Sequence, residues 1–114
     1  MQNVELTARR EALGLTQSGL AELLNINQTS VGQWERARYK VPIWLDAELT
    51  KLEDMVDEMV EAMTSTIIES EKRTVEIHVQ PRNERSVSIL ERVAAARAQY
   101  KLRSTGIDIS IVEA

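Results

Sequence analysis

Apolar residues recur at helical spacing in the first third of the chain, in three short runs separated by turn-forming residues. The first run covers about residues 3–13 and ends at Gly14, a residue type suited to a helix C-terminus. The second run follows Thr16, and the third, over about residues 28–35, follows Asn27; both residue types can cap a helix. Between them Asn25 tolerates a left-handed backbone, so it can end one helix and turn the chain into the next. The pattern predicts three short helices, the last two joined by a tight turn.

The following apolar run predicts one long helix over about residues 42–66, with Pro42 in its first turn. Its apolar positions are alternately four and three residues apart, which is a heptad seam. The seam positions are Leu45, Leu49, Leu52, Val56, Met59, Met63 and then Thr66 or Ile67. A seam of this length exceeds what three short helices need. Its second half therefore packs either on another copy of the chain or on the C-terminal part of the same chain.

After residue 73 the apolar period changes from that of a helix to that of strands. Residues 74–80 and 107–111 alternate, and about residues 83–102 between them read as a helix. The inward positions of that helix are Val87, Leu90, Val93, Ala94 and Ala98. A strand, a crossover helix and a strand permit a parallel pair. Two strands alone are marginal in water, so a second copy that extends the sheet would complete the unit.

The third short helix presents a polar face. Its inward positions are Val31 and Trp34, and its outward positions are Gln28, Thr29, Ser30, Gly32 and Gln33. Glutamine offers a donor and an acceptor that match the major-groove edge of adenine, and a threonine methyl can meet the thymine methyl. An ordinary solvated helix face is the alternative interpretation, because polar faces are common.

Composition removes several classes of function. The chain has 114 residues, no cysteine and a single histidine, His78, on the polar side of a predicted strand. A catalytic dyad or a zinc site therefore lacks its residues, and we expect no enzyme activity, no metal and no cofactor. The acidic residues of the long helix lie off its seam and read as a solvated face. No apolar run approaches a membrane span, so we expect a cytoplasmic protein without membrane contact.

Net charge is −4, which by itself does not suit a nucleic-acid binder. The negative charge is concentrated in residues 42–70, which hold eight acidic and one basic side chain, whereas residues 1–41 hold five basic and four acidic ones. We expect few phosphate contacts and a dependence on dimerisation. The C-terminal helix is basic through Arg82, Arg85, Arg92 and Arg97. These arginines could contact DNA, bind an acidic partner or simply face solvent.

A set of residues in the first half resembles a known family. The set is Leu13-Gly14-Leu15-Thr16-Gln17, Leu20-Ala21, Leu24, Ile26, Gln28, Val31 and Trp34-Glu35. Residues 4–60 are thereby similar to the helix-turn-helix domain of the Cro/cI-type (XRE) regulators, which include the lambdoid phage repressors. The order of elements also resembles the anti-CRISPR-associated (Aca-type) autorepressors, with Trp34-Glu35, Arg38 and Val41-Pro42 as the matching residues.

The resemblance implies roles for individual residues. Base-reading positions are Gln28, Thr29 and Gln33. Positions that contact the DNA backbone are Gln17, Asn27, Ser30, Arg36, Arg38 and Lys40. Arg10 and Glu35 stand where the family has a structural ion pair. The family often has Asn-Gly after this glutamate, whereas this chain has Arg36-Ala37, which leaves open how the third helix ends and what Arg36 does.

The expected fold is mainly α with a small α+β C-terminal part: an N-terminal helix-turn-helix bundle, a long linking helix and a C-terminal strand–helix–strand dimerisation unit. We expect domains at residues 1–66 and 67–114. The residues expected in the dimer seam are Val56, Met59, Met63, Ile77 and Ile109.

The expected function is a sequence-specific, homodimeric repressor that binds an inverted repeat in double-stranded DNA and regulates its own operon. The alternative is an antitoxin whose C-terminal unit binds a partner protein and whose helix-turn-helix regulates the operon.

Overall fold

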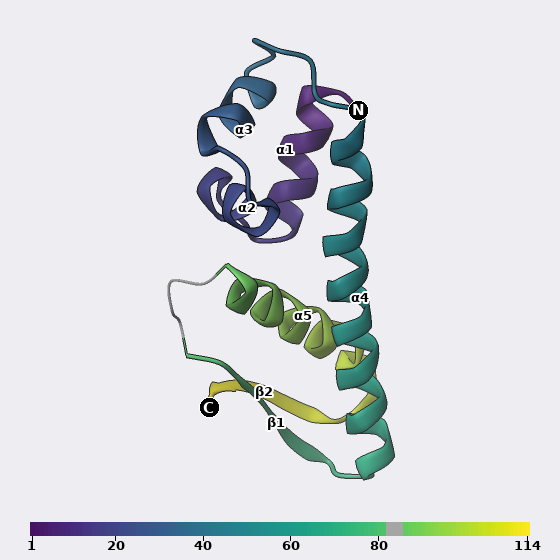
Figure 1. Ribbon diagram of the computed structural model, residues 1–114. Coiled ribbons are helices and arrows are strands. Elements are labelled where there is room, and N and C mark those ends of the chain that lie inside the picture. The colour runs from purple at the N-terminus through teal and green to yellow at the C-terminus, as the bar shows by residue number, and fades with distance from the viewer. Residues whose placement is uncertain (82–85) are drawn as a thin grey trace.

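The computed structural model describes residues 1–81 and 86–114 (Figure 1). Three short helices gather at one end of the molecule: α1 (Asn3–Ala12), α2 (Gln17–Leu24) and α3 (Gln28–Glu35). A single long helix, α4 (Trp44–Ser70), runs from this bundle along the length of the molecule. The chain is accordingly elongated, with extents of 51 × 26 × 17 Å.

Side chains at both predicted caps fix the helix-turn-helix locally. The Thr16 hydroxyl accepts a hydrogen bond from the Gly19 N–H at 2.9 Å, and the Asn27 side chain accepts one from the Thr29 N–H at 2.8 Å. Asn25 between α2 and α3 is left-handed, with φ of 54°. Each of these roles was predicted from residue type, and each satisfies a backbone group that a helix end leaves unpaired.

The end of α3 resolves a question that the sequence leaves open. Without the glycine that the family often has, Ala37 itself adopts the left-handed conformation, with φ of 60°. The Ala37 N–H donates to the Trp34 carbonyl at 3.1 Å and the Arg38 N–H donates to the Gln33 carbonyl at 2.9 Å. This is the hydrogen-bond pattern of a Schellman motif, so α3 stops at the family position although no glycine is present.

The buried stripe of α4 differs from the predicted heptad seam in its second half. The buried positions are Leu45, Leu49, Leu52, Val56, Val60, Thr64 and Ile67. The seam prediction was wrong at Met59 and Met63, which are only partly buried, because the stripe moves by one residue after Val56. A straight helix drifts by about 20° per heptad relative to a 3.5-residue repeat. The helix also continues four residues beyond the predicted end, to Ser70.

The C-terminal part contains β1 (Thr74–Val79), α5 (Val87–Lys101), the short 3₁₀ helix η1 (Arg103–Thr105) and β2 (Asp108–Glu113). The two strands are parallel, which the order strand, helix, strand permits, and Ile77 of β1 lies opposite Ile111 of β2. The predicted start of the helix at Asn83 lies outside the described residues.

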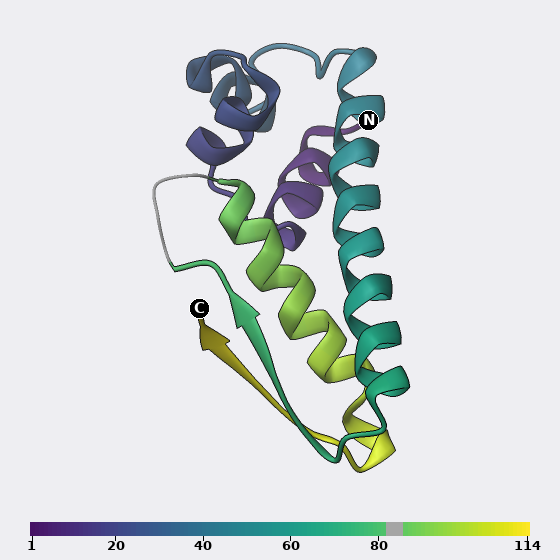
Figure 2. The same ribbon diagram turned by 60° about the horizontal axis from the view of Figure 1, so that its bottom comes forward.

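Helix α5 lies between the sheet and α4 (Figure 2). Its buried positions are Ser88, Leu90, Ala94, Ala95 and Ala98. Three of these residues are alanines, whose small side chains let α5 approach its neighbours closely. Val87 was predicted to face inward, but its side chain is 43% exposed, since it stands at the first turn of the helix.

Helix α5 also touches the N-terminal bundle. The Arg97 side chain donates to the Ala12 carbonyl at 2.8 Å, and the Ser86 hydroxyl donates to the Glu22 carboxylate at 3.2 Å. Gly14 faces Val93 so closely that a Cβ atom there would lie 2.8 Å from a valine methyl. One hydrophobic core therefore runs from the bundle to the sheet.

The residues predicted for a dimer seam fall into two groups in the structure. Val56, Ile77 and Ile109 are buried inside the single chain, and their part in a dimer contact stays a prediction. Met59 and Met63 are only partly buried and keep exposed surface. In residues 1–81 and 86–114, no helix is both long enough and apolar enough to cross a membrane.

Candidate nucleic-acid interface

Helix α3 lies at the edge of the N-terminal bundle, on the side away from α4 (Figure 1). Its inward side chain Val31 is fully buried. On the outward face Gln28 and Thr29 are exposed, and Ser30 and Gln33 are half-buried. This face presents amides and hydroxyls to solvent, which is what reading of base edges requires.

An ion pair holds α3 from behind. The Arg10 guanidinium donates two parallel hydrogen bonds to the Glu35 carboxylate, at 2.7 and 2.9 Å, and a third to the Leu15 carbonyl at 2.8 Å. Only 12% of the arginine side chain and 7% of the glutamate side chain are exposed. The pair joins α1 to the end of α3, as the resemblance implied, and its geometry is the bidentate one that makes such pairs strong.

The surroundings of Glu35 keep it ionised. Burial alone would raise the pKa of this carboxyl group, but hydrogen bonds from Arg10 and Gln17 outweigh burial, and the pKa lies below its ordinary value. The pKa of Arg10 is raised, chiefly by its hydrogen bond to Glu35. Both partners are therefore charged at neutral pH, and α3 is anchored by a permanent pair.

Gln17 occupies the start of α2 and reaches α3. Its side-chain nitrogen donates to the Glu35 carboxylate at 3.2 Å. The amide thus braces the helix that carries the polar face. Its role toward a DNA phosphate, which the resemblance implied, stays a prediction.

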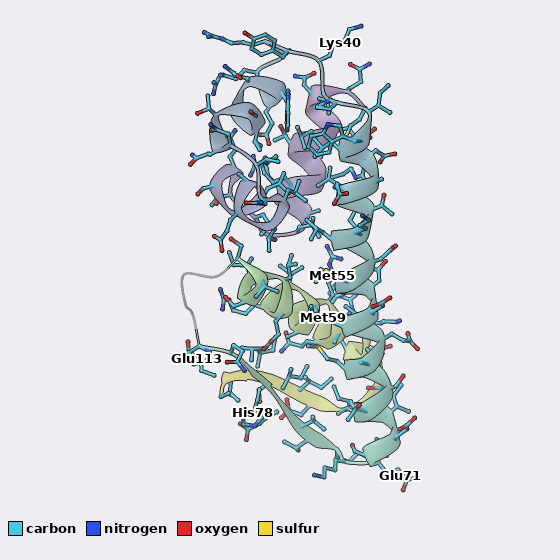
Figure 3. All side chains as sticks on the ribbon, in the orientation of Figure 1. Lys40, Met55, Met59, Glu71, His78 and Glu113 are labelled. Atoms are coloured by element: carbon cyan, nitrogen blue, oxygen red, sulfur yellow. The ribbon has the colours of Figure 1, made fainter. Side chains whose placement is uncertain are left out.

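Three positively charged residues lie directly after α3: Arg36, Arg38 and Lys40. All three side chains are exposed, and Lys40 lies at the end of the molecule beyond α3 (Figure 3). Within the part of the chain that the structure describes, none of them takes part in an ion pair. Their charges are available to an outside anion such as a phosphate.

Two sets of contacts at this site were not predicted from the sequence. Asn3 donates from its side chain to the Glu35 carbonyl at 3.2 Å, which ties the start of α1 to the end of α3. Arg9 donates to the Glu53 carboxylate at 3.0 and 2.6 Å and also binds Asp46, which clamps α1 to α4. These partners are distant in sequence, so no local spacing could have indicated them.

The remaining candidates are separate from this face. His78 is exposed on β1, far from α3 (Figure 3). Among the described residues, no group of three or more His, Asp or Glu side chains is arranged to hold a metal ion. In the basic C-terminal helix, Arg97 is bound to the Ala12 carbonyl, and Arg82 and Arg85 lie outside the described residues.

Comparison with protein families agrees with this geometry. Residues 6–43 match the family described as Helix-turn-helix, and the match covers most of α1, all of α2 and α3, and the loop before α4. A search of curated proteins returned no match for the chain. The N-terminal segment is thus a helix-turn-helix of the XRE type, a domain of DNA-binding transcription regulators.

Proposed function

We propose that the protein is a sequence-specific, homodimeric repressor that binds an inverted repeat upstream of its own gene. The observation that carries this proposal is the polar face of α3, held rigidly from behind by the pair between Arg10 and Glu35. A helix with exposed amides and hydroxyls, fixed to its bundle by buried charges, suits insertion into the major groove.

In this proposal Gln28, Thr29 and Gln33 read base edges. Glutamine can pair with adenine through two hydrogen bonds, and the threonine methyl can pack on a thymine methyl. Contacts to the DNA backbone come from Gln17, Asn27, Ser30, Arg38 and Lys40. Such contacts set the position of the protein on the duplex and carry no direct sequence information.

Dimerisation is proposed through the C-terminal unit. The sheet has only two strands among the described residues, and isolated two-stranded sheets are marginal in water. Beside it lies a groove of about 310 Å³, lined mainly by apolar side chains of α4 and β1 that include Met63 and Val75. A second copy of the chain at this surface would cover the groove and supply the second α3 that an inverted repeat requires.

The packing of the C-terminal unit favours a repressor over an antitoxin. An antitoxin segment that folds only on its toxin would lack a core of its own. Here Leu90, Ala94 and Ala98 are fully buried within the single chain. An antitoxin that binds a partner protein through this unit is the second candidate function. Both candidates regulate their own operon through the helix-turn-helix.

The proposal is tested by fluorescence anisotropy with duplex DNA from upstream of the protein's own gene. We expect tight binding to one inverted repeat over random DNA. Replacing Gln28 by alanine should cost about 1–3 kcal/mol on the repeat and relax the preference at one base pair. Arg38→Ala is the matched control, because it should weaken binding to all duplexes and reduce the salt dependence. Equal losses on the repeat and on random DNA for Gln28→Ala would refute the base-reading role.

The dimer is tested separately by light scattering. Met63→Glu places a charge in the groove between α4 and β1 and should produce monomers. Met55→Glu is the control, since Met55 is an exposed methionine of α4 that does not line the groove. A wild-type monomer, or a Met63→Glu dimer, would contradict this interface.

A further inference from the structure

We propose that Arg36 reads a guanine base, in place of the backbone contact that the resemblance implied, and that its guanidinium is positioned by packing against Gly32. The proposal rests on the proposed function and deepens it, because it adds a specificity-determining residue to a face otherwise made of amides and hydroxyls.

The position of Arg36 places it on the reading face. It directly follows α3, and its own N–H donates to the Gly32 carbonyl at 3.0 Å, so it still belongs to the last helical turn. Residues seven apart in a helix stand almost in line, nearly two turns from each other. Arg36 therefore projects on the same side as Thr29, one of the predicted base readers.

The side chain of Arg36 lies back along the helix. The two terminal guanidinium nitrogens of Arg36 are 3.1 and 3.4 Å from the point where a Cβ atom on Gly32 would stand. The Gln17 side-chain oxygen is 3.3 Å from the same point. The guanidinium thus stands over Gly32, inside the span of α3, and not beyond the end of the helix.

This packing gives a reason for a glycine inside α3. Glycine weakens a helix interior relative to alanine, so its presence in a short helix calls for a close approach that a side chain would prevent. Gly32 is buried, although it stands on the outward face, because the side chains of Arg36 and Gln17 cover it. Even an alanine here would press on the guanidinium.

The charge of Arg36 is free to bind an outside group. Its neighbour Glu35 is occupied by Arg10 and Gln17. Arg9 and Arg10, in contrast, each form an ion pair with a carboxylate of the same chain. Within residues 1–81 and 86–114 no ion pair or side-chain hydrogen bond engages the Arg36 guanidinium.

The position of the guanidinium over α3, on the same side as Thr29, favours contact with a base. When a helix enters the major groove, side chains on the middle of its outward face meet the groove floor, where the base edges lie. Arg38 and Lys40 lie beyond the end of α3, where the phosphates line the groove. Guanine presents O6 and N7 as two adjacent acceptors, and the arginine fork donates to both. Adenine keeps N7 but replaces the second acceptor by a donor, so it is rejected.

The experiment begins by selecting the preferred duplex of the wild-type protein from a pool of short randomised duplexes. Anisotropy then measures the affinity for that duplex and for each single base-pair change. We expect one G·C pair whose replacement by A·T weakens the wild type by about 10- to 100-fold. Arg36→Ala should bind the two duplexes equally, and Arg36→Lys should retain charge but lose most of the preference. The control Arg38→Ala should weaken both duplexes and keep the preference.

Two results would overturn the inference and leave the proposed function standing. In the first, Arg36→Ala weakens all duplexes equally and keeps the preference for guanine, which would make Arg36 a phosphate contact. In the second, Arg36→Ala changes nothing while Gln28→Ala still removes a base preference. A wild-type protein without any sequence preference would overturn both the inference and the proposed function, so the two failures are distinguishable.

Discussion

The N-terminal bundle and the C-terminal unit are stabilised in different ways. The bundle combines a buried apolar core, in which Leu6, Leu20 and Val31 are fully buried, with directional polar contacts. These are two helix caps, an ion pair between α1 and the end of α3, and the clamp of α1 on α4. The C-terminal unit is held mainly by close apolar packing, in which Ala94 and Ala98 of α5 are fully buried.

The difference explains how far each region can be recognised from sequence. Caps and ion pairs demand particular residue types at particular positions, so they leave a signature that a family can share. Alanine packing demands only small size at helical spacing. The family match covers residues 6–43 and ends before α4 begins.

The largest expected effect is the loss of the buried pair. Glu35→Gln leaves the Arg10 guanidinium buried beside a neutral group, and we expect a destabilisation of about 3–5 kcal/mol, measured by urea unfolding. Glu11→Gln is the control, because that carboxylate is 65% exposed and 3.9 Å from the same arginine. A loss for Glu35→Gln no larger than for Glu11→Gln would mean that polar contacts do not hold the bundle.

The same pair predicts a pH dependence. Because the pKa of Glu35 is lower in the folded protein than its ordinary value of 4.5, its contribution is complete above that value and is lost as pH falls through the folded pKa. The difference in unfolding free energy between the wild type and Glu35→Gln should therefore shrink in acid. A difference that stays constant from neutral pH to acid would assign the stabilisation to packing.

The contact between the two regions gives the next largest effect. Gly14→Ala must place a side chain at φ of 73° and against Val93, and we expect a loss of about 2–4 kcal/mol from these two causes. Gly106→Ala has the same backbone problem at φ of 81°, but its nearest neighbour is 3.9 Å away, so it should cost only about 1–2 kcal/mol. Equal losses in urea unfolding would show that α5 does not press on the bundle.

Enlarging an alanine tests the packing of the C-terminal unit. Ala94→Leu should force α5 away from its neighbours and cost about 1–3 kcal/mol. Ala96→Leu on the exposed side of the same helix should be nearly neutral. Thermal unfolding of both variants measures the difference, and a tolerated leucine at residue 94 would indicate a loosely packed contact.

The smallest expected effect is a gain. Ala37→Gly removes the cost of a left-handed alanine at the end of α3 and should stabilise the protein by about 1 kcal/mol. Ala47→Gly, at an exposed position of α4, should destabilise it by about the same amount. Opposite signs in urea unfolding would confirm that the left-handed cap, and not glycine itself, is responsible.

Much of the fold could be predicted because local patterns carry it. Period and turn residues predicted the five α-helices and both strands, but not the 3₁₀ helix η1, and residue type predicted the caps at Thr16 and Asn27. The prediction failed in the second half of α4, where Val60 and Thr64 replace the two methionines in the buried stripe. A choice between neighbouring faces of one helix depends on what packs there, and no local pattern contains that information.

For this protein, the sequence alone determined the elements and the polar face that α3 presents, because helical spacing and capping chemistry act over a few residues. Tertiary structure decided the rest. Only the packed chain shows that Arg9 clamps α1 to α4, that α5 touches Gly14, and that the Arg36 guanidinium stands over Gly32. The first two of these contacts join residues far apart in the chain, and the third depends on the direction that one long side chain takes, so their existence depends on how whole elements and side chains come together.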